Sequence, residues 1–162
     1  AVEEAARIAH EAGVKVVLNF SPITQVPDSL LKLVDVLIVN QHELAVLSGR
    51  EIDVEDLDQL REAVDSLGMT QVVLTLGGDG SLVLDNGEST RIPIFPVDTV
   101  DTTGAGDSFM GSLLSALAAG CTLADGACLA AAVSSLATTK VGAQASYRGA
   151  AAVRSFLESQ EL

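Results

Sequence analysis

The sequence predicts an α/β fold with a mixed, mostly parallel sheet, and three patterns carry this prediction. Short apolar runs of the kind found in buried strands alternate with amphipathic helical stretches, which is typical of parallel βαβ units. Glycines stand where the helical stretches end. An Asn86-Gly87 pair between two apolar segments indicates one antiparallel hairpin, so the sheet is mixed. The length of 162 residues suits one domain with a proper core.

The first half of the chain is expected to alternate helix and strand. It opens on a helix with neither an initiator Met nor an N-cap residue before it, as expected of a cut through a larger protein. In chain order the expected elements are a helix closed by Gly13, a strand over 14–18, a loop over 19–27, a short helix near 28–33, a strand over 36–39, a helix over 43–47 ended by Gly49, a helix with Leu57, Leu60, Val64 and Leu67 on one face and Gly68 at its end, and a strand over 72–76.

The second half is expected to begin with the hairpin and to continue as helices. Residues 81–84 and 91–95 are the predicted hairpin strands. Helices are expected over 104–119, 123–138 and 150–158, with a loop containing Gly142 before the last. Cys121 and Cys128 are expected to be buried small hydrophobes; on one helix their α carbons would lie about 10 Å apart, beyond disulfide reach.

Composition excludes several classes of partner. Nine Lys and Arg against 22 Asp and Glu give a net charge of −13, which repels nucleic acids and anionic membranes. With 3% aromatic residues and no Trp, the chain offers no platform for base stacking. No run approaches the roughly 18 apolar residues that span a bilayer, so a cytoplasmic location is expected. A phosphate ligand would need local backbone dipoles and a divalent cation.

The segment 100–109, Val-Asp-Thr-Thr-Gly-Ala-Gly-Asp-Ser-Phe, is typical of an anion-binding loop. Its glycines let the backbone approach a ligand, and the amides that begin the next helix lack intrahelical partners. A P-loop is excluded because Ser112-Leu113 stand where Lys and Ser or Thr are required. A dinucleotide fingerprint is disfavoured because Phe109 replaces the third small residue.

Three motifs in order resemble those of the ribokinase or PfkB family of carbohydrate and nucleoside kinases. They are Asn40-Gln41-His42-Glu43, Thr75-Leu76-Gly77-Gly78-Asp79-Gly80 and Asp101-Thr102-Thr103-Gly104-Ala105-Gly106-Asp107. The resemblance spans essentially the whole chain. It implies a ribokinase-like three-layer αβα sandwich, of which residues 1–162 are the C-terminal, nucleotide-binding part without the N-terminal sugar-binding half and its lid.

The resemblance also implies an activity, the ATP-dependent transfer of a phosphoryl group to a hydroxyl of a sugar. The amides of Gly104, Ala105 and Gly106 would form an anion hole, and Asp107 would be the catalytic base. The implied nucleotide-binding residues are Asn40, Thr75, Leu76, Gly77, Gly78, Asp79, Gly80, Gly106 and Asp107. Because a carboxylate is a far weaker base than an alkoxide, the acceptor proton would leave late in a loose transition state.

Two cations follow from the same resemblance. Glu43 would organise the water shell of a phosphate-bound Mg²⁺. The oxygens implied for K⁺ belong to Asp101, Thr103, Ala137, Lys140, Gly142 and Ser146. Some ribokinases carry a polar residue facing the adenine on the penultimate helix, whereas this chain has Ala130, Ala131 and Ala132 there, which leaves purine selectivity open.

Simpler explanations stay open beside these roles. The glycine loop at 104–107 could be a closely packed helix start, Asn40 and Glu43 an ordinary cap, the turn at 77–80 a strand-to-hairpin connection, and 141–146 a plain interhelix loop. His10 and His42 are expected at the surface without a role.

Alternatives of function also stay open. One is a non-catalytic nucleotide-binding or regulatory module, and another is a nucleoside or fructose-type kinase of the same family. The expected partners are a nucleotide and a small sugar, and the parent protein is expected to be a homodimer. The chain alone is expected to bind nucleotide weakly, to turn over little sugar and to expose an unpaired sheet edge.

Overall fold

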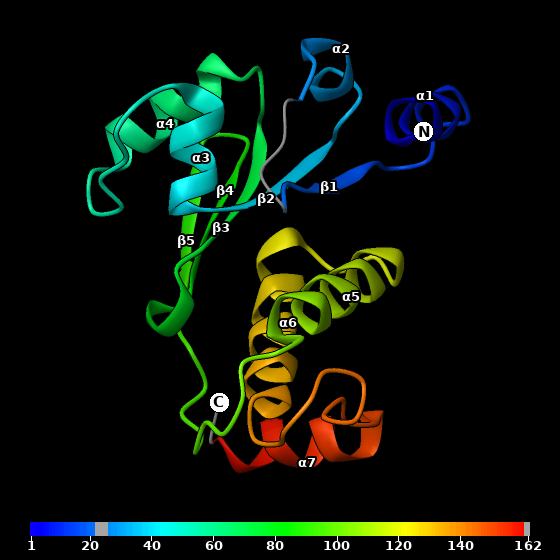
Figure 1. The fold of residues 1–162 in the computed structure, drawn as a ribbon, viewed down its shortest axis with the longest axis vertical. Coiled ribbons are helices and arrows are strands. Elements are labelled where there is room, and N and C mark those ends of the chain that lie inside the picture. The colour runs from blue at the N-terminus through cyan, green and yellow to red at the C-terminus, as the bar shows by residue number, and fades with distance from the viewer. Residues whose placement is uncertain (22–25, 161–162) are drawn as a thin grey trace. The chain divides into compact units, whose positions relative to one another are not determined.

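The computed structural model describes residues 1–21 and 26–160, and the chain in it divides into two compact units (Figure 1). The first unit consists of Ala1–Leu76 and Leu82–Thr90. The second consists of Gly77–Ser81 and Arg91–Leu162. The boundary therefore falls within the two strands of the hairpin, and each unit is described by itself.

The first unit holds most of a five-stranded sheet with the strand order β1-β2-β3-β4-β5. β1 pairs with β2 and β2 with β3 in parallel, whereas the short connections between β3, β4 and β5 require antiparallel neighbours. In chain order the elements are α1 (Val2–Glu11), β1 (Val17–Asn19), α2 (Asp28–Leu31), β2 (Val36–Asn40), α3 (Gln41–Ser48), α4 (Leu57–Ser66), β3 (Gln71–Thr75), β4 (Ser81–Asp85) and β5 (Glu88–Ile92).

Alternate residues of the central strands form one core with the helices of this unit. Leu37 and Val39 of β2 and Val72 and Leu74 of β3 are buried in it. Each of the helices α1 to α4 contributes to this core, with Ala6, Leu30, Leu44, Leu60, Ala63 and Val64. Because the intervening strand residues are buried as well, β2 and β3 read as continuous apolar runs rather than as alternating ones.

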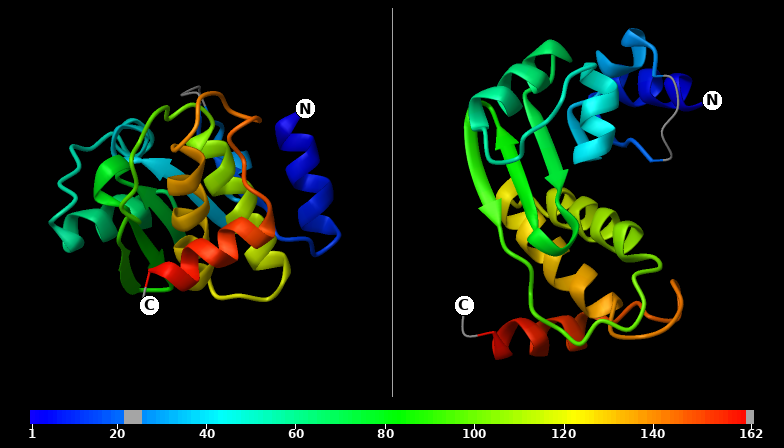
Figure 2. Two further views of the ribbon diagram at one scale, coloured as in Figure 1. Left: turned by 90° about the horizontal axis from the view of Figure 1, so that it is seen from below. Right: turned by 60° about the vertical axis from the view of Figure 1, so that its left-hand side comes forward.

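The second unit is built on helices. They are the short 3₁₀ helix η1 (Gly77–Asp79), α5 (Ala105–Ala118), α6 (Leu123–Ala137) and α7 (Ala150–Ser159), and α5 and α6 pack against each other (Figure 2). A Cβ placed on Gly126 of α6 would come within 2.9 Å of Leu113 Cδ1, so this glycine allows the two helices to approach closely. No described helix is long and apolar enough to cross a membrane.

The structure confirms the α/β class, the mixed sheet and the order of elements. Gly13, Gly49 and Gly68 follow their helices with φ between 66° and 69°, as helix-ending glycines should. Asn86 and Gly87 both have positive φ, as a two-residue hairpin turn requires. His10 and His42 are exposed, as expected. Residues 22–25 of the expected loop lie outside the described residues.

Three details differ from the expectations. The first strand begins at Val17 rather than at Val14, because the Val14 amide donates to the Ala9 carbonyl and extends the end of α1. β5 spans Glu88–Ile92 rather than the expected 91–95, because it begins directly after the two-residue turn. The prediction that Cys121 is buried was wrong: it precedes Thr122, the N-cap of α6, and is exposed, whereas Cys128 within the helix is half-buried.

Candidate active site

The glycine loop at 101–107 makes a left-handed turn and then begins α5. Gly104 is the N-cap residue, with φ of 79°, and its carbonyl accepts the Ser108 amide at 2.9 Å. The Ala105 amide donates to the Thr102 carbonyl at 3.1 Å. One of the three amides expected in the anion hole therefore already has an acceptor within the loop.

The other amides at the start of α5 are available to a ligand. Within residues 1–21 and 26–160, those of Gly104, Gly106 and Asp107 donate to no protein acceptor. Gly106 and Asp107 are exposed. Unpaired amides in the first turn of a helix attract anions, both by hydrogen bonding and through the helix dipole. The arrangement places an exposed carboxylate beside three free donors.

Gly104 is required by space as well as by backbone conformation. A Cβ added there would lie 2.8 Å from both the Ala143 Cβ and the Tyr147 hydroxyl oxygen, which is closer than such atoms approach. The loop that follows α6 therefore packs directly onto the turn that precedes α5.

Asp101 ties the same two loops together. Its Oδ1 accepts the Thr103 amide at 2.9 Å, and its Oδ2 accepts the Gly142 amide at 2.8 Å, 41 residues away in sequence. These hydrogen bonds, that from Gly142 foremost, favour the ionised form and lower the pKa of Asp101 to about 2. The carboxylate that opens the motif thus acts as a brace between two loops.

The segment after α6 brings several oxygens close to this brace. The Thr138 carbonyl accepts the amides of Val100 and Asp101 at 2.8 and 3.1 Å. Ser146 is fully buried, and its hydroxyl donates to the Ala143 carbonyl at 2.6 Å. A segment of this kind offers peptide carbonyls and a hydroxyl, which are the hard oxygen ligands that suit K⁺. The donor set at 137–146 is therefore chemically compatible with the expected cation.

The glycine turn at 77–80 is separated from the end of β3 by one residue. Gly80 has φ of 88°, and a Cβ added to it would collide with the Ile92 carbonyl. Its amide donates to the Gly77 carbonyl at 3.3 Å. Gly77 and Gly78 are exposed, and nothing lies within 4 Å of a Cβ built on either. Gly80 therefore shapes the strand-to-hairpin turn, as the simpler explanation expects. The backbone of Gly77 and Gly78 is accessible from solvent.

Asn40 and Glu43 form a complete capping box at the start of α3. The Asn40 Oδ1 accepts the Glu43 amide at 2.9 Å, and Glu43 Oε2 accepts the Asn40 amide at 2.7 Å. The register of β2 and β3 pairs Asn40 with Thr75. Both residues therefore stand at the carboxyl ends of neighbouring parallel strands, which is where α/β proteins commonly bind ligands.

The predicted site residues are shared between the two units. Asn40, Glu43, Thr75 and Leu76 belong to the first. The turn at 77–80, the loop at 101–107 and the segment at 137–146 belong to the second. The structure brings the last two of these together, through Asp101 and Gly104.

Some residues in these contacts were not predicted. Thr138, Ala143 and Tyr147 contact the loop through a backbone carbonyl or through packing, and neither leaves a signature in the sequence. Ala130, Ala131 and Ala132 are buried, so they belong to the helix packing of their unit.

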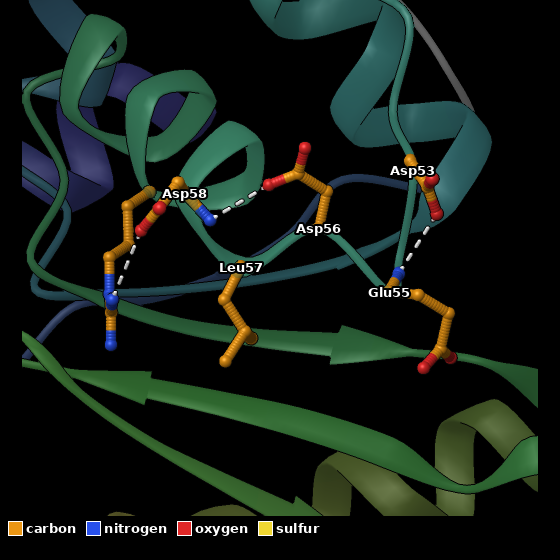
Figure 3. Close-up of a pocket in the computed structure, with 6 residues that line it drawn as sticks. Asp53, Glu55, Asp56, Leu57 and Asp58 are labelled. Atoms are coloured by element: carbon orange, nitrogen blue, oxygen red, sulfur yellow. Dashed lines mark hydrogen bonds and ion pairs between the residues drawn. The ribbon is translucent and has the colours of Figure 1, made fainter.

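An acidic hollow lies in the first unit, and no predicted site residue lines it. Asp53, Glu55, Asp56, Leu57, Asp58 and Arg61 line a volume of about 510 Å³ (Figure 3). Two of its carboxylates have local structural roles: Asp56 caps α4 by accepting two amides, and Asp53 accepts the amide of Glu55. Among the described residues no group of three or more His, Cys, Asp or Glu is placed to hold a metal ion.

Comparison with known proteins gives a consistent result. The family model described as pfkB family carbohydrate kinase matches residues 1–149. Ribokinase from Haemophilus influenzae is 36% identical over 158 residues, covering 97% of this chain and 52% of that protein. The bifunctional ribokinase/ribose-5-phosphate isomerase A of Fructilactobacillus sanfranciscensis is 42% identical over 119 residues, covering 72% of this chain and 22% of its own length.

Solved structures agree in fold. Arabidopsis thaliana ribokinase, solved with ribose and ATP, superposes with a TM-score of 0.89 at 33% identity, covering 97% of this chain and 52% of that one. Ribokinase from Thermotoga maritima superposes with a TM-score of 0.84 at 28% identity, covering 95% and 52%. The chain spans about half, or less, of the length of these relatives, and its fold is that of the ribokinase-like α/β proteins.

Proposed function

The chain belongs to the pfkB family of carbohydrate kinases, and from that premise we propose that it provides the nucleotide-binding and catalytic part of an ATP-dependent sugar kinase of ribokinase type. In this proposal residues 1–162 are the C-terminal part of the kinase domain. The γ-phosphoryl group of ATP is transferred to a hydroxyl of a sugar.

The observation that carries the proposal is the start of α5. Three amides, those of Gly104, Gly106 and Asp107, have no protein acceptor in the described chain and lie next to the exposed Asp107 carboxylate. Donors fixed before the reaction stabilise the charge that develops on a transferred phosphoryl group. The Ala105 amide, assigned to the anion hole by resemblance, contributes less in this proposal because it already donates to Thr102.

Asp107 is the proposed base. A carboxylate is far too weak a base to remove an alcohol proton before the reaction. In a loose transition state the acceptor oxygen keeps its proton until bond formation is advanced, so a carboxylate within hydrogen-bond reach is enough. Asp107 would orient the acceptor hydroxyl and take up its proton late.

The nucleotide contacts are proposed at two other places. Thr75, Leu76, Gly77, Gly78 and Asp79 would lie against the nucleoside part of ATP, and the open backbone at Gly77 and Gly78 supports this. Gly80 would shape the turn. Asn40 would approach the phosphates from the end of β2, where it stands beside Thr75.

Two cations complete the proposal. Bound Mg²⁺ would neutralise charge on the ATP phosphates. Glu43 would hold its water shell, since only one of the two carboxylate oxygens is engaged in the capping box. K⁺ would be held by oxygens of Asp101, Thr103, Ala137, Lys140, Gly142 and Ser146. Both carboxylate oxygens of Asp101 already accept amides, so this residue would also hold the segment around Gly142 in place.

The acceptor is a separate matter, because the chain spans about half of its relatives. We propose ribose or a similar small sugar, on the similarity to ribokinases. A nucleoside or fructose-type acceptor and a non-catalytic nucleotide-binding module are the alternatives. A homodimeric parent protein in the cytoplasm also belongs to this proposal.

The test is Asp107→Ala in the full-length protein that carries this chain. Formation of ADP would be measured with ribose, fructose and a nucleoside as acceptors, and the ATP dissociation constant by calorimetry. We expect turnover to fall at least a hundredfold, within the range for loss of a general base. ATP affinity should stay within a few fold.

Asp98→Ala is the matched control, since Asp98 is an exposed carboxylate of the same unit for which no hydrogen bond is described. It should leave turnover unchanged. Unchanged turnover in Asp107→Ala would remove the base assignment. ATP binding without turnover of any acceptor by the unmodified full-length protein would favour the non-catalytic module.

A further inference from the structure

The carbonyl oxygen of Ala105 accepts two side-chain hydroxyls. Ser108, one turn further along α5, donates at 2.8 Å, and Ser134 of α6 donates at 3.0 Å. Serines inside helices commonly bond a carbonyl of their own preceding turn, as Ser112 does with Ser108 at 2.7 Å. Ser134 instead donates across to the neighbouring helix α5.

This carbonyl belongs to the same peptide group as the Gly106 amide. The peptide group is planar and trans, so its carbonyl and its N–H point in opposite directions. Hydroxyls that hold the Ala105 oxygen on one side therefore fix the direction of the Gly106 N–H on the other. That N–H is one of the amides with no protein acceptor in the described chain.

Such a restraint matters at a glycine. Gly106 is exposed, and outside its own helix backbone and chain neighbours no heavy atom would lie within 4 Å of a Cβ built on it, so no side chain packs against this face of the residue. Glycine also has the widest choice of backbone conformations. Hydrogen bonding to a carbonyl in addition polarises the peptide and strengthens its N–H as a donor. The bond from a second helix therefore both orients and strengthens this donor.

We propose that Ser134 is a positioning residue for the anion-binding amide of Gly106. The inference rests on the proposed function, because it assumes that this amide meets the phosphoryl group that is transferred. Ser134 lies on α6 outside the three family motifs, and acts through the Ala105–Gly106 peptide without touching a ligand.

The experiment compares Ser134→Ala with Ser135→Ala. Ser135 is the next residue of α6, is also half-buried, and has no side-chain hydrogen bond among those described, so it controls for loss of a helical serine hydroxyl. Affinities for ATP and for ADP would be measured by calorimetry on the full-length protein that carries this chain. The Gly106 amide would be followed by ¹H–¹⁵N NMR in both titrations.

We expect Ser134→Ala to weaken ATP binding about threefold to tenfold, a fraction of the loss seen when such a donor is removed altogether. ADP lacks the γ-phosphate, so the affinity of the variant for ADP should stay within twofold of that of the unmodified protein. The ATP-induced shift of the Gly106 amide should shrink. Ser134→Thr restores the hydroxyl and should recover most of the ATP affinity, whereas Ser135→Ala should change neither nucleotide.

Two outcomes would overturn the inference while the proposed function stands: Ser134→Ala behaving as Ser135→Ala does, or an equal loss of ATP and ADP affinity that Ser134→Thr does not restore. If the unmodified full-length protein does not bind ATP, or binds it with no response at Gly106, the assignment of the anion site fails first and the inference fails with it.

Discussion

Asp101 shows how one carboxylate can link two loops that are distant in sequence. It accepts the amides of Thr103 and Gly142, and these bonds hold its pKa at about 2, well below its usual range. A carboxyl whose pKa is lowered by folding contributes stability at pH values above its unfolded pKa of about 4. That contribution is lost as the pH falls from about 4 towards 2.

We therefore predict that Asp101→Asn lowers the free energy of unfolding at pH 7, and that its difference from the unmodified chain shrinks between pH 4 and pH 2. Urea unfolding followed by circular dichroism at pH 7, 4, 3 and 2 would measure this. Asp98→Asn serves as the control, since no hydrogen bond to this carboxylate is described. A constant difference at every pH would show that the two amides do not favour the charged form.

Gly104 carries two independent constraints, and Gly111 of the same helix carries neither. Gly104→Ala would place a Cβ against Ala143 and Tyr147 in a left-handed conformation, whereas a Cβ on Gly111 would meet nothing within 4 Å. We predict that Gly104→Ala costs at least about 1 kcal/mol of stability through the backbone alone. It should also weaken ATP binding tenfold or more.

Gly111→Ala should instead raise stability by roughly 0.5–1 kcal/mol, because alanine favours the helix interior. Thermal unfolding of both variants, with and without ATP, separates the two effects. Equal stability changes in the two variants would contradict the packing observed at Gly104.

At the scale of elements, the start of α3 combines a structural and a proposed functional role in one residue. Glu43 completes the capping box, and glutamine can occupy this position of the box as well. We predict that Glu43→Gln keeps the melting temperature within about 2 °C, since loss of a few tenths of a kcal/mol moves it little. The Mg²⁺ concentration needed for half-maximal ATP binding should rise severalfold.

Asn40→Ala is the matching control for the cap. It should lower stability by about 1 kcal/mol, because it removes the acceptor for the Glu43 amide. If Glu43→Gln leaves the Mg²⁺ requirement unchanged while Asn40→Ala is destabilising, Glu43 is part of a helix cap and nothing more.

The elements themselves could largely be predicted from the sequence, because each is encoded by local patterns. Apolar runs predicted β2 and β3, glycines predicted the helix ends, and Asn86-Gly87 predicted the hairpin. The structure gives these glycines the expected positive φ. The errors lie where a single local contact determines the end of an element or the exposure of a residue. Val14 leaves the strand because its amide donates to the end of α1, and Cys121 is exposed just before Thr122, the N-cap of α6.

At the scale of the whole molecule, family motifs could be found from the sequence, whereas the contacts that support them could not. Asp101, Gly104 and Asp107 belong to a recognisable signature. Contacts to the same loop come from Ser134, Thr138 and Tyr147, about 30 to 40 residues away, through a hydroxyl, a carbonyl and a phenol oxygen. Many residue types can make such contacts, and pairing distant segments requires the tertiary structure.

The net charge of −13 provides a last prediction, because it opposes the binding of an anionic nucleotide at long range. Raising ionic strength from about 0.01 to 0.15 M shortens the screening length from roughly 30 to 8 Å. If backbone amides bind the phosphates at short range, added salt should weaken the long-range repulsion between the protein and the nucleotide more than it weakens these hydrogen bonds. The association rate of a fluorescent ATP analogue, measured by stopped flow, should therefore rise about twofold to threefold.

Tetramethylammonium chloride is the appropriate salt for this experiment, since its bulky cation does not imitate K⁺. A phosphate-free nucleoside analogue is the control. A rate that falls with salt would instead indicate steering by lysine or arginine side chains around the site.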